Sequence, residues 1–345
     1  MSIEREIQRY LNQHAARSQN TAKTYRNALT RFREFLEERE VDLEGPVTQL
    51  TVALARDFVT WLAAQRYTRG RTEHQLSMRS RSLYTQSVSG LYRMLVLEGK
   101  LDITYGEYTA LHEHMVRSTS YTIPPVEKKL PPDEVVDAVL AAALTLPDLE
   151  QLDRRKQRRL RLIWLRNRAM ILCLVSTGMR VGELVGLRRG DLDHDDQGAW
   201  VSGKGDKERF VRFSNQAWGA LTAYLEARHD EWVATKVADF PLFCRHDRSA
   251  GDHRRLPLGS LTVERLITDL ANDAGVLDRF NLTPHSFRHW FATRFLRHTR
   301  NLALTQDVMG HASPQTTRIY AKTTKEDHIT AHESLFDNRG KSDDE

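Results

Sequence analysis

The chain has 345 residues, enough for two domains that each bury a hydrophobic core. Its formal net charge is +5 and its sequence pI is about 9.2, which favours a polyanionic partner. The two cysteines, Cys173 and Cys244, are too few for a disulfide framework and fit a reducing cytosol. No stretch approaches the roughly 20 apolar residues of a membrane span, and the first residues do not resemble a signal peptide. The sequence therefore predicts a cytoplasmic or nucleoid-associated protein.

Positive charge is concentrated in two stretches of the chain, Arg154–Arg168 and Arg69–Arg81. Basic clusters of this kind are the electrostatic footprint of nucleic-acid binding. For either cluster taken alone, a solvated helix face is the plain alternative.

The first 118 residues have helical periodicity and no strand signal. Asn20 or Thr21 can cap a helix whose apolar stripe runs from Tyr25 to Leu36. Two more helices are expected at about 53–65 and 81–97. The region is predicted to be a compact all-helical domain that presents basic and hydroxyl side chains.

A connector is expected after this helical region, because periodicity weakens beyond about Thr104. The run Ile123–Pro132 contains four prolines, and a residue before proline is pushed out of the α region. The run is therefore predicted to be semi-rigid and extended. We expect a first domain at 1–118, a linker at 119–132 and a second domain at 133–345.

The second domain is expected to be mostly helical, with helices that start at Asp133 and an apolar helix that ends at Gly178. One β signal interrupts this pattern. Residues 199–202 and 209–213 flank a glycine-containing turn and predict an antiparallel hairpin. Helices are expected again at about 215–228 and 262–274.

The segment 283–320 carries several side chains suited to binding a phosphate. Thr283 can cap a helix that begins at Pro284, because proline lacks the N–H that would have no partner there. His285 and Arg288 share a face of that helix. Three phenylalanines at helical spacing are expected to hold it against a core: Phe287, Phe291 and Phe295. A second helix start at 313–314 would open a short helix that carries Tyr320.

Five motifs in this order resemble the catalytic boxes of the tyrosine recombinase (phage integrase-like) family. They are Thr177–Leu184, Gly203–Arg209, His285–Arg288, Gly310–His311 and Tyr320. The hairpin around the second motif and the nine-residue step from His311 to Tyr320 agree with the family pattern. Each motif alone is short and occurs by chance in many proteins. Five motifs in the family order, each with suitable local structure, are specific. The resemblance covers most of the second domain and is looser in the first. The lean chain is most similar to Xer-like members or simple mobile-element integrases.

The resemblance implies a mechanism of DNA strand breakage and rejoining. Tyr320 would attack a phosphodiester and form a 3′-phosphotyrosyl bond, which frees a 5′-hydroxyl. Arg180 and Arg288 would bind the non-bridging oxygens, and His311 would donate another hydrogen bond to them. Arginine suits this task, because its planar, permanently charged fork matches the geometry of a phosphate.

Other roles implied by the resemblance leave choices open. His285 would act as general base or help to bind the phosphate. Lys204 would protonate the departing 5′-oxygen, although Lys207 lies in the same turn and is the alternative. Glu183 would orient Arg180. The resemblance implies no metal and no cofactor, because the cations are side chains.

The implied fold is mainly α, with an N-terminal helical bundle (a SAM-like core-binding domain) and a mostly helical catalytic domain that contains a small antiparallel sheet.

The implied partner is double-stranded DNA with a specific recombination site. Four copies would assemble on two sites and exchange strands through a Holliday junction. A helix at about 325–336 could dock on a neighbouring copy or pack within its own chain. Two alternatives stay open: a type IB topoisomerase, and a catalytically silent DNA-binding protein of the same fold.

Overall fold

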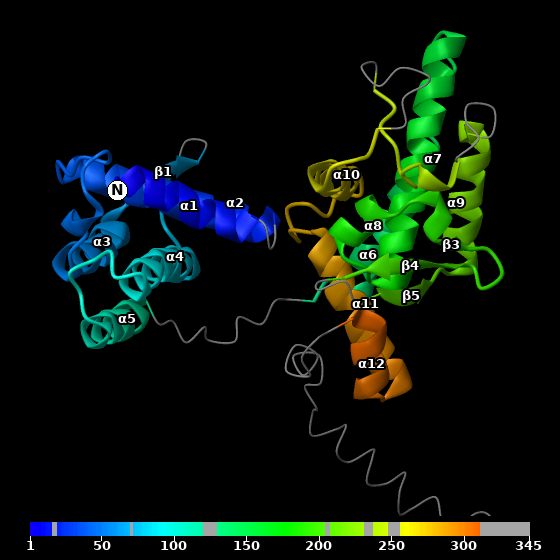
Figure 1. Cartoon of the computed structure of the whole chain (residues 1–345). Coiled ribbons are helices and arrows are strands. Elements are labelled where there is room, and N and C mark those ends of the chain that lie inside the picture. Colours follow the sequence, from blue (N-terminus) through cyan, green and yellow to red (C-terminus); the bar gives the residue numbers. More distant parts are fainter. Residues whose placement is uncertain are drawn as a thin grey trace, which may run out of the picture. The chain divides into compact units, whose positions relative to one another are not determined.

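The computed structural model describes residues 1–15, 19–69, 72–119, 130–203, 208–230, 237–247 and 256–310. The chain divides into two compact units, Met1–Val126 and Glu127–Glu345, which run from blue to cyan and from green to orange in Figure 1. Each unit has its own cluster of buried apolar side chains. Within the described ranges, no helix is both long and apolar enough to cross a bilayer. Most of the expected linker lies outside these ranges, so its boundaries stay a prediction.

Unit 1 is built from helices around an aromatic core. Its elements are α1 (Ile3–Ala15), α2 (Gln19–Glu38), a 3₁₀ turn η1 (Val47–Gln49), α3 (Val52–Ala64), β1 (Arg66–Arg69), β2 (Thr72–Gln75), α4 (Met78–Leu97) and α5 (Tyr105–Thr119). Phe32, Phe35, Phe58 and Tyr92 are fully buried and their rings pack edge to face or stacked. The expected helices at 53–65 and 81–97 correspond to α3 and α4.

The expectation of an all-helical first unit was wrong, because β1 and β2 form an antiparallel hairpin. The register pairs Arg66 with Gln75 and Tyr67 with His74. Both strands are short and mostly polar, and their residues 66, 67 and 73–75 are exposed, so neither has the alternation of apolar and polar residues by which strands are recognised.

The N-terminal ends of two helices also differ from the expectation. Helix α2 already includes Gln19, so neither Asn20 nor Thr21 precedes it as a cap. Helix α5 lies where weakening periodicity predicted a connector. Its start carries a reciprocal bond pair, since the Thr104 backbone N–H donates to Glu107 Oε2 over 2.8 Å and the Glu107 N–H donates to Thr104 Oγ1 over 3.2 Å. This capping box was the signal in the sequence that would have predicted α5.

Unit 2 combines helices with a small antiparallel sheet, which confirms the predicted fold class. Its elements are α6 (Asp133–Leu144), α7 (Arg154–Thr177), α8 (Val181–Gly186), η2 (Arg189–Asp191), β3 (Leu192–Asp193), β4 (Gly198–Ser202), β5 (Glu208–Arg212), α9 (Asn215–Arg228), η4 (Val237–Asp239), α10 (Ser260–Asp273), α11 (Pro284–Thr299) and α12 (Leu302–Met309). The sheet order is β3-β4-β5, and Val201 pairs with Arg209. The predicted hairpin is therefore β4–β5.

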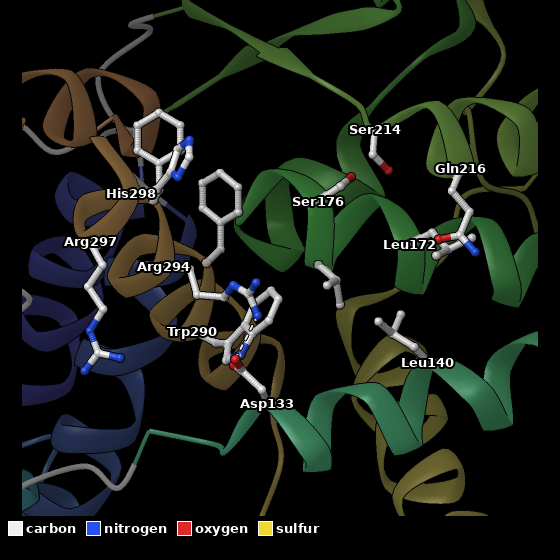
Figure 2. Close-up of a pocket in the computed structure, with 13 residues that line it drawn as sticks. Asp133, Leu140, Leu172, Ser176, Ser214, Gln216, Trp290, Arg294, Arg297 and His298 are labelled. Atoms are coloured by element: carbon white, nitrogen blue, oxygen red, sulfur yellow. Dashed lines mark hydrogen bonds and ion pairs between the residues drawn. The ribbon is translucent and has the colours of Figure 1, made fainter. Parts of the chain in front are cut away.

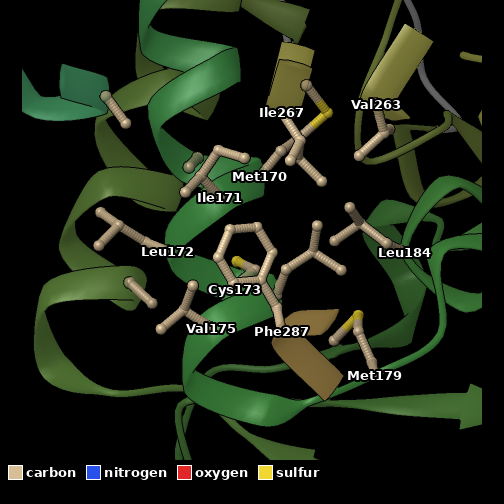
Figure 3. Packing of buried hydrophobic residues seen from close by; sticks show 14 of the residues in the cluster. Met170, Ile171, Leu172, Cys173, Val175, Met179, Leu184, Val263, Ile267 and Phe287 are labelled. Carbon is tan, nitrogen blue, oxygen red and sulfur yellow. The ribbon is translucent and has the colours of Figure 1, made fainter. Parts of the chain in front are cut away.

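The C-terminal half of α7 is the centre of the core of unit 2. Figure 3 shows its side chains from Met170 to Val175 around the ring of Phe287 on α11, with residues of α8 and α10 on the other side. Phe287 is fully buried, and Phe291 packs partly buried against the same cluster. This packing fixes the end of α7 against the start of α11, and the two predicted phosphate-binding motifs lie at these two places.

Helix α11 begins as the sequence predicts. Thr283 is its N-cap and Pro284 its first residue, and the Thr283 Oγ1 accepts from the Ser286 N–H over 3.2 Å. Further along, the Trp290 indole donates to Asp133 Oδ1 over 2.7 Å and Arg294 lies 2.9 Å from the other oxygen of that carboxylate. Figure 2 shows this link between the first residue of α6 and α11, at the edge of a pocket of about 690 Å³.

Candidate active site

Arg180 stands at the junction of two helices. Helix α7 ends at Thr177, Gly178 takes the left-handed conformation with φ of 61°, and Arg180 is the N-cap of α8. Its guanidinium Nη1 lies 2.7 Å from Glu183 Oε1, and its Nη2 donates to the carbonyl of Gly310 over 3.2 Å. The side chain is 41% exposed, so a ligand at the surface can reach it.

Arg288 is buried and ties two distant turns of the chain together. Its side chain projects from α11, and the residue is only 3% exposed. Nη1 donates to the carbonyl of Gly178 over 2.8 Å, and Nη2 donates to the carbonyl of Met309 over 2.5 Å. The two acceptors lie at the C-terminal ends of α7 and α12, so Arg288 holds these two helix ends beside each other.

The end of α12 is the meeting point of the two arginines. Arg288 donates to the carbonyl of Met309 and Arg180 to the carbonyl of the next residue, Gly310. Gly310 takes φ of 60° and ends the helix, which Asn301 caps at its start. The residue that follows Gly310 in the sequence is His311. Motifs from three separate parts of the chain thus converge on one turn.

Glu183 is the anion that holds the cluster together, with only 5% of its side chain exposed. Arg209 donates to both of its oxygens, from Nη1 over 2.9 Å and from Nη2 over 2.7 Å. The backbone N–H of Arg180 donates to it as well, over 2.8 Å. Burial alone would raise the pKa of Glu183, but the hydrogen bonds and charge of Arg209 and Arg180 outweigh it and lower the pKa to about 2.

Arg209 is the residue of this cluster to which sequence reasoning gave no role. It lies on β5, is 11% exposed, and its Nε donates to the carbonyl of Val308 over 3.1 Å. It therefore connects the sheet, the buried carboxylate and α12. The signal in the sequence was weak, because Arg209 is marked only as the last residue of the motif that begins at Gly203.

The predicted site residues divide into two groups. The structure brings Arg180, Glu183 and Arg288 together. His285 lies on the same helix as Arg288, one turn earlier, and is exposed, and its ring packs edge to face on His289 with centroids 4.3 Å apart. Four predicted residues lie outside the described ranges: Lys204, Lys207, His311 and Tyr320.

The arrangement is suited to an oxyanion. Arg180 and Arg209 share the carboxylate of Glu183, and Arg288 donates to the backbone carbonyl of Met309 next to the acceptor of Arg180, so among these four side chains positive charge is in excess. A guanidinium has five N–H donors in a fixed plane, which leaves donors for a phosphate after one or two protein contacts. Helix ends and a buried carboxylate hold these donors in place before any ligand arrives, which is the condition for stabilising developing charge.

Comparison with known proteins decides the family. The profile of the phage integrase family matches residues 149–327, more than half of the chain, and that of the phage integrase N-terminal SAM-like domain matches residues 6–99. The chain belongs to the phage integrase family. Among curated relatives, tyrosine recombinase XerD of Mycobacterium leprae is 32% identical over 317 residues, covering 88% of this chain and 87% of the relative. Tyrosine recombinase XerC of Listeria welshimeri is 27% identical over 324 residues, or 94% of each chain.

Solved structures of phage integrase relatives share the fold. The XerH site-specific recombinase bound to palindromic difH substrate matches 96% of this chain and 84% of that chain, with a TM-score of 0.65 and 20% sequence identity. By its family and its curated relatives, the chain is a tyrosine-type site-specific recombinase, an enzyme that breaks and rejoins DNA strands. Neither the topoisomerase nor the catalytically silent alternative is favoured by these relatives.

Proposed function

We propose that Tyr320 is the nucleophile of this recombinase. Its phenol oxygen attacks the scissile phosphorus, the bond from phosphorus to the 5′-oxygen breaks, and a 3′-phosphotyrosyl bond stores the bond energy for rejoining. The free phenol has a pKa near 10, so its proton must be removed during attack. His285 takes that proton or donates to the phosphate instead, and both roles suit an exposed imidazole on the first turn of α11.

The phosphate clamp is assigned to Arg180, Arg288 and His311. One observation carries this proposal: the two arginines donate to the successive carbonyls of Met309 and Gly310, immediately before His311. Three motifs that carry the family resemblance thus meet at one turn, which supports their assignment to one site. Glu183 and Arg209 act as positioning residues, since they touch the clamp and not the substrate.

Lys204 is proposed to protonate the departing 5′-oxygen, with Lys207 as its rival in the same turn. An alkoxide is a poor leaving group, so a general acid at this oxygen speeds cleavage and, as the conjugate base, rejoining. The turn follows β4 and precedes β5, and β5 carries Arg209 into the cluster. Chain connectivity thus supports a lysine from this turn at the site.

The proposed substrate is duplex DNA that carries a specific recombination site, in the nucleoid. Four copies would assemble on two sites and exchange strands in pairs through a Holliday junction. The XerH relative was solved with its DNA substrate in a post-cleavage complex, which supports duplex DNA as the partner. Chromosome-dimer resolution and mobile-element integration are both served by this chemistry.

A nicked suicide substrate tests the nucleophile. The nick lets the short 5′-hydroxyl strand diffuse away, so cleavage leaves protein covalently on the DNA. Wild type is expected to give an adduct that survives denaturation with detergent, and Tyr320→Phe is expected to give none although it still binds DNA. An adduct with Tyr320→Phe would overturn the assignment, and relaxation of supercoiled plasmid without a recombination site would favour the topoisomerase alternative.

A substrate with sulfur in place of the scissile 5′-oxygen separates the two lysines. A thiolate leaves without a proton, so a variant that lacks the general acid regains cleavage on this substrate, whereas one that lacks another function does not. We expect Lys204→Ala to be slow on the natural ester and rescued by sulfur, and Lys207→Ala to be less affected on both. The opposite pattern would assign the role to Lys207.

A further inference from the structure

The N-terminal half of α7 is a strongly basic surface that the active site does not use. The helix contains eight basic residues and no acidic one. The buried residues lie in its second half, whereas the first two turns are largely exposed and project beyond the helices packed around the core (Figure 1). We call the exposed set the basic arm: Arg154, Arg155, Lys156, Arg158 and Arg161.

Within the described ranges, the basic arm makes few ion pairs with the rest of the fold. Among the described residues, its ion pairing is limited to Lys156 and Asp153, 3.8 Å apart and both about half exposed. The later arginines of α7 are different. Arg166 is 7% exposed and donates to the carbonyl of Cys244 over 3.0 Å, and Arg168 lies over the ring of Trp164. Structural roles therefore account for those two, and not for the arm.

The charges of the arm are placed where they oppose folding. The N-terminus of a helix carries partial positive charge, so acidic residues stabilise its first turn and basic ones destabilise it. The first turns of α1 and α6 follow that rule and carry acidic residues, whereas those of α2, α4 and α10 do not. The first turn of α7 has three basic residues and no acidic one, and the carboxylate of its N-cap Asp153 offsets part of that charge. Arg154 and Arg158 add repulsion between like charges four residues apart.

The arm cannot bind the phosphate that the active site binds. Arg180 follows the last turn of α7, and Arg158 lies 19 residues before Thr177. At 1.5 Å per residue, this separation along the helix is about 28 Å. On one strand of B-DNA, phosphates this far apart are separated by about eight nucleotides at 3.4 Å each. Any phosphates that the arm contacts therefore lie outside the reacting step.

We propose that the basic arm is a second DNA-backbone-binding surface, which holds phosphates away from the active site and reads no base sequence. The proposal rests on the recombinase class, which makes DNA the substrate. Arginine side chains on an exposed helix neutralise phosphates by charge and release counterions, so binding through them weakens as salt rises. A polyanion also relieves the repulsion that the free helix carries. The arm thus adds affinity, while specificity comes from elsewhere in the protein.

The experiment compares two quadruple variants of the full chain at positions 154, 155, 158 and 161, one with glutamine and one with lysine. Both also carry Tyr320→Phe, so that binding is measured without cleavage. Dissociation constants on a 40-base-pair duplex are measured between about 50 and 200 mM salt. Each phosphate contact contributes about 0.9 to the slope of log affinity against log salt. We expect the glutamine variant, which lacks four arginines, to lose about 3.6 units of slope and more than tenfold in affinity at low salt.

Two controls make the result specific. The lysine variant keeps the charge and is expected to retain the wild-type slope. The melting temperature of the glutamine variant is expected to stay equal or rise, because charges that oppose the helix are gone. An unchanged slope, or a loss of affinity that accompanies a lower melting temperature, would overturn the proposal. A failure of Tyr320→Phe to abolish the covalent adduct would overturn the nucleophile alone, because the arm is tested by binding.

Discussion

Two helix ends meet at Arg288, and the molecule holds them by different means. Gly178 and Gly310 both end a helix with positive φ, 61° and 60°. A Cβ on Gly178 would lie 2.5 Å from the ring of Phe291, whereas a Cβ on Gly310 would lie 2.9 Å from the guanidinium of Arg209. The first turn is therefore fixed by the hydrophobic core, and the second by the polar cluster of the site. Stability should depend mainly on the first turn, and chemistry mainly on the second.

Gly178→Ala is expected to have the largest effect on stability. A side chain in the left-handed conformation is strained, and the added methyl group overlaps the ring of Phe291, which packs partly buried against the core. Together these effects should lower the free energy of unfolding by about 3–5 kcal/mol. Urea unfolding followed by circular dichroism measures this loss.

Gly182→Ala is the matched control for that change, since Gly182 lies in α8 with no atom within 4 Å of an added Cβ. Alanine favours a helix over glycine by up to about 1 kcal/mol, so the control should be neutral or slightly stabilising. If Gly178→Ala unfolded at the same urea concentration as the control, the core would not fix this turn.

Glu183→Gln tests the polar turn next. It leaves the charge of Arg209, whose side chain is 11% exposed, without its anion, which should lower the free energy of unfolding by about 2–3 kcal/mol. It should also release Arg180 and slow formation of the covalent DNA adduct by more than tenfold. Single-turnover cleavage of the suicide substrate measures the rate, and Glu226→Gln, an exposed carboxylate on α9, serves as the control.

The same carboxylate makes stability depend on acid. The pKa of Glu183 is about 2 in the folded chain against 4.5 for the ordinary group, so the folded state favours the ionised form. Its contribution of about 3 kcal/mol is complete above pH 5 and is lost as pH falls towards 2. Unfolding curves of wild type and Glu183→Gln should therefore converge over this window. If the difference in unfolding free energy between wild type and Glu183→Gln did not change with pH, protonation of Glu183 would not be linked to stability.

Local signals in the sequence predicted much of this frame. The cap Thr283 and the first-turn Pro284 predicted the start of α11, and the end of the apolar run 169–175 at Gly178 predicted the end of α7. The contacts of Arg209 with Glu183 could not be predicted this way, because they depend on how β5 packs beside α8. A periodicity describes one element, whereas this cluster exists only where separate elements pack together.

Gly310→Ala is expected to have the smallest effect on stability and a large one on chemistry. Its strain of about 1–2 kcal/mol comes from the left-handed backbone, since the atom in its way belongs to a side chain that can move. That side chain is Arg209, and a small shift of it bends its hydrogen bonds to Glu183 and to the carbonyl of Val308 without breaking the ion pair. The carbonyl of Gly310 also accepts from Arg180, so the clamp is disturbed from two sides. We expect cleavage to fall more than tenfold while the urea midpoint falls less than in Gly178→Ala. Equal losses of stability in both variants would mean that core and site fix the two turns alike.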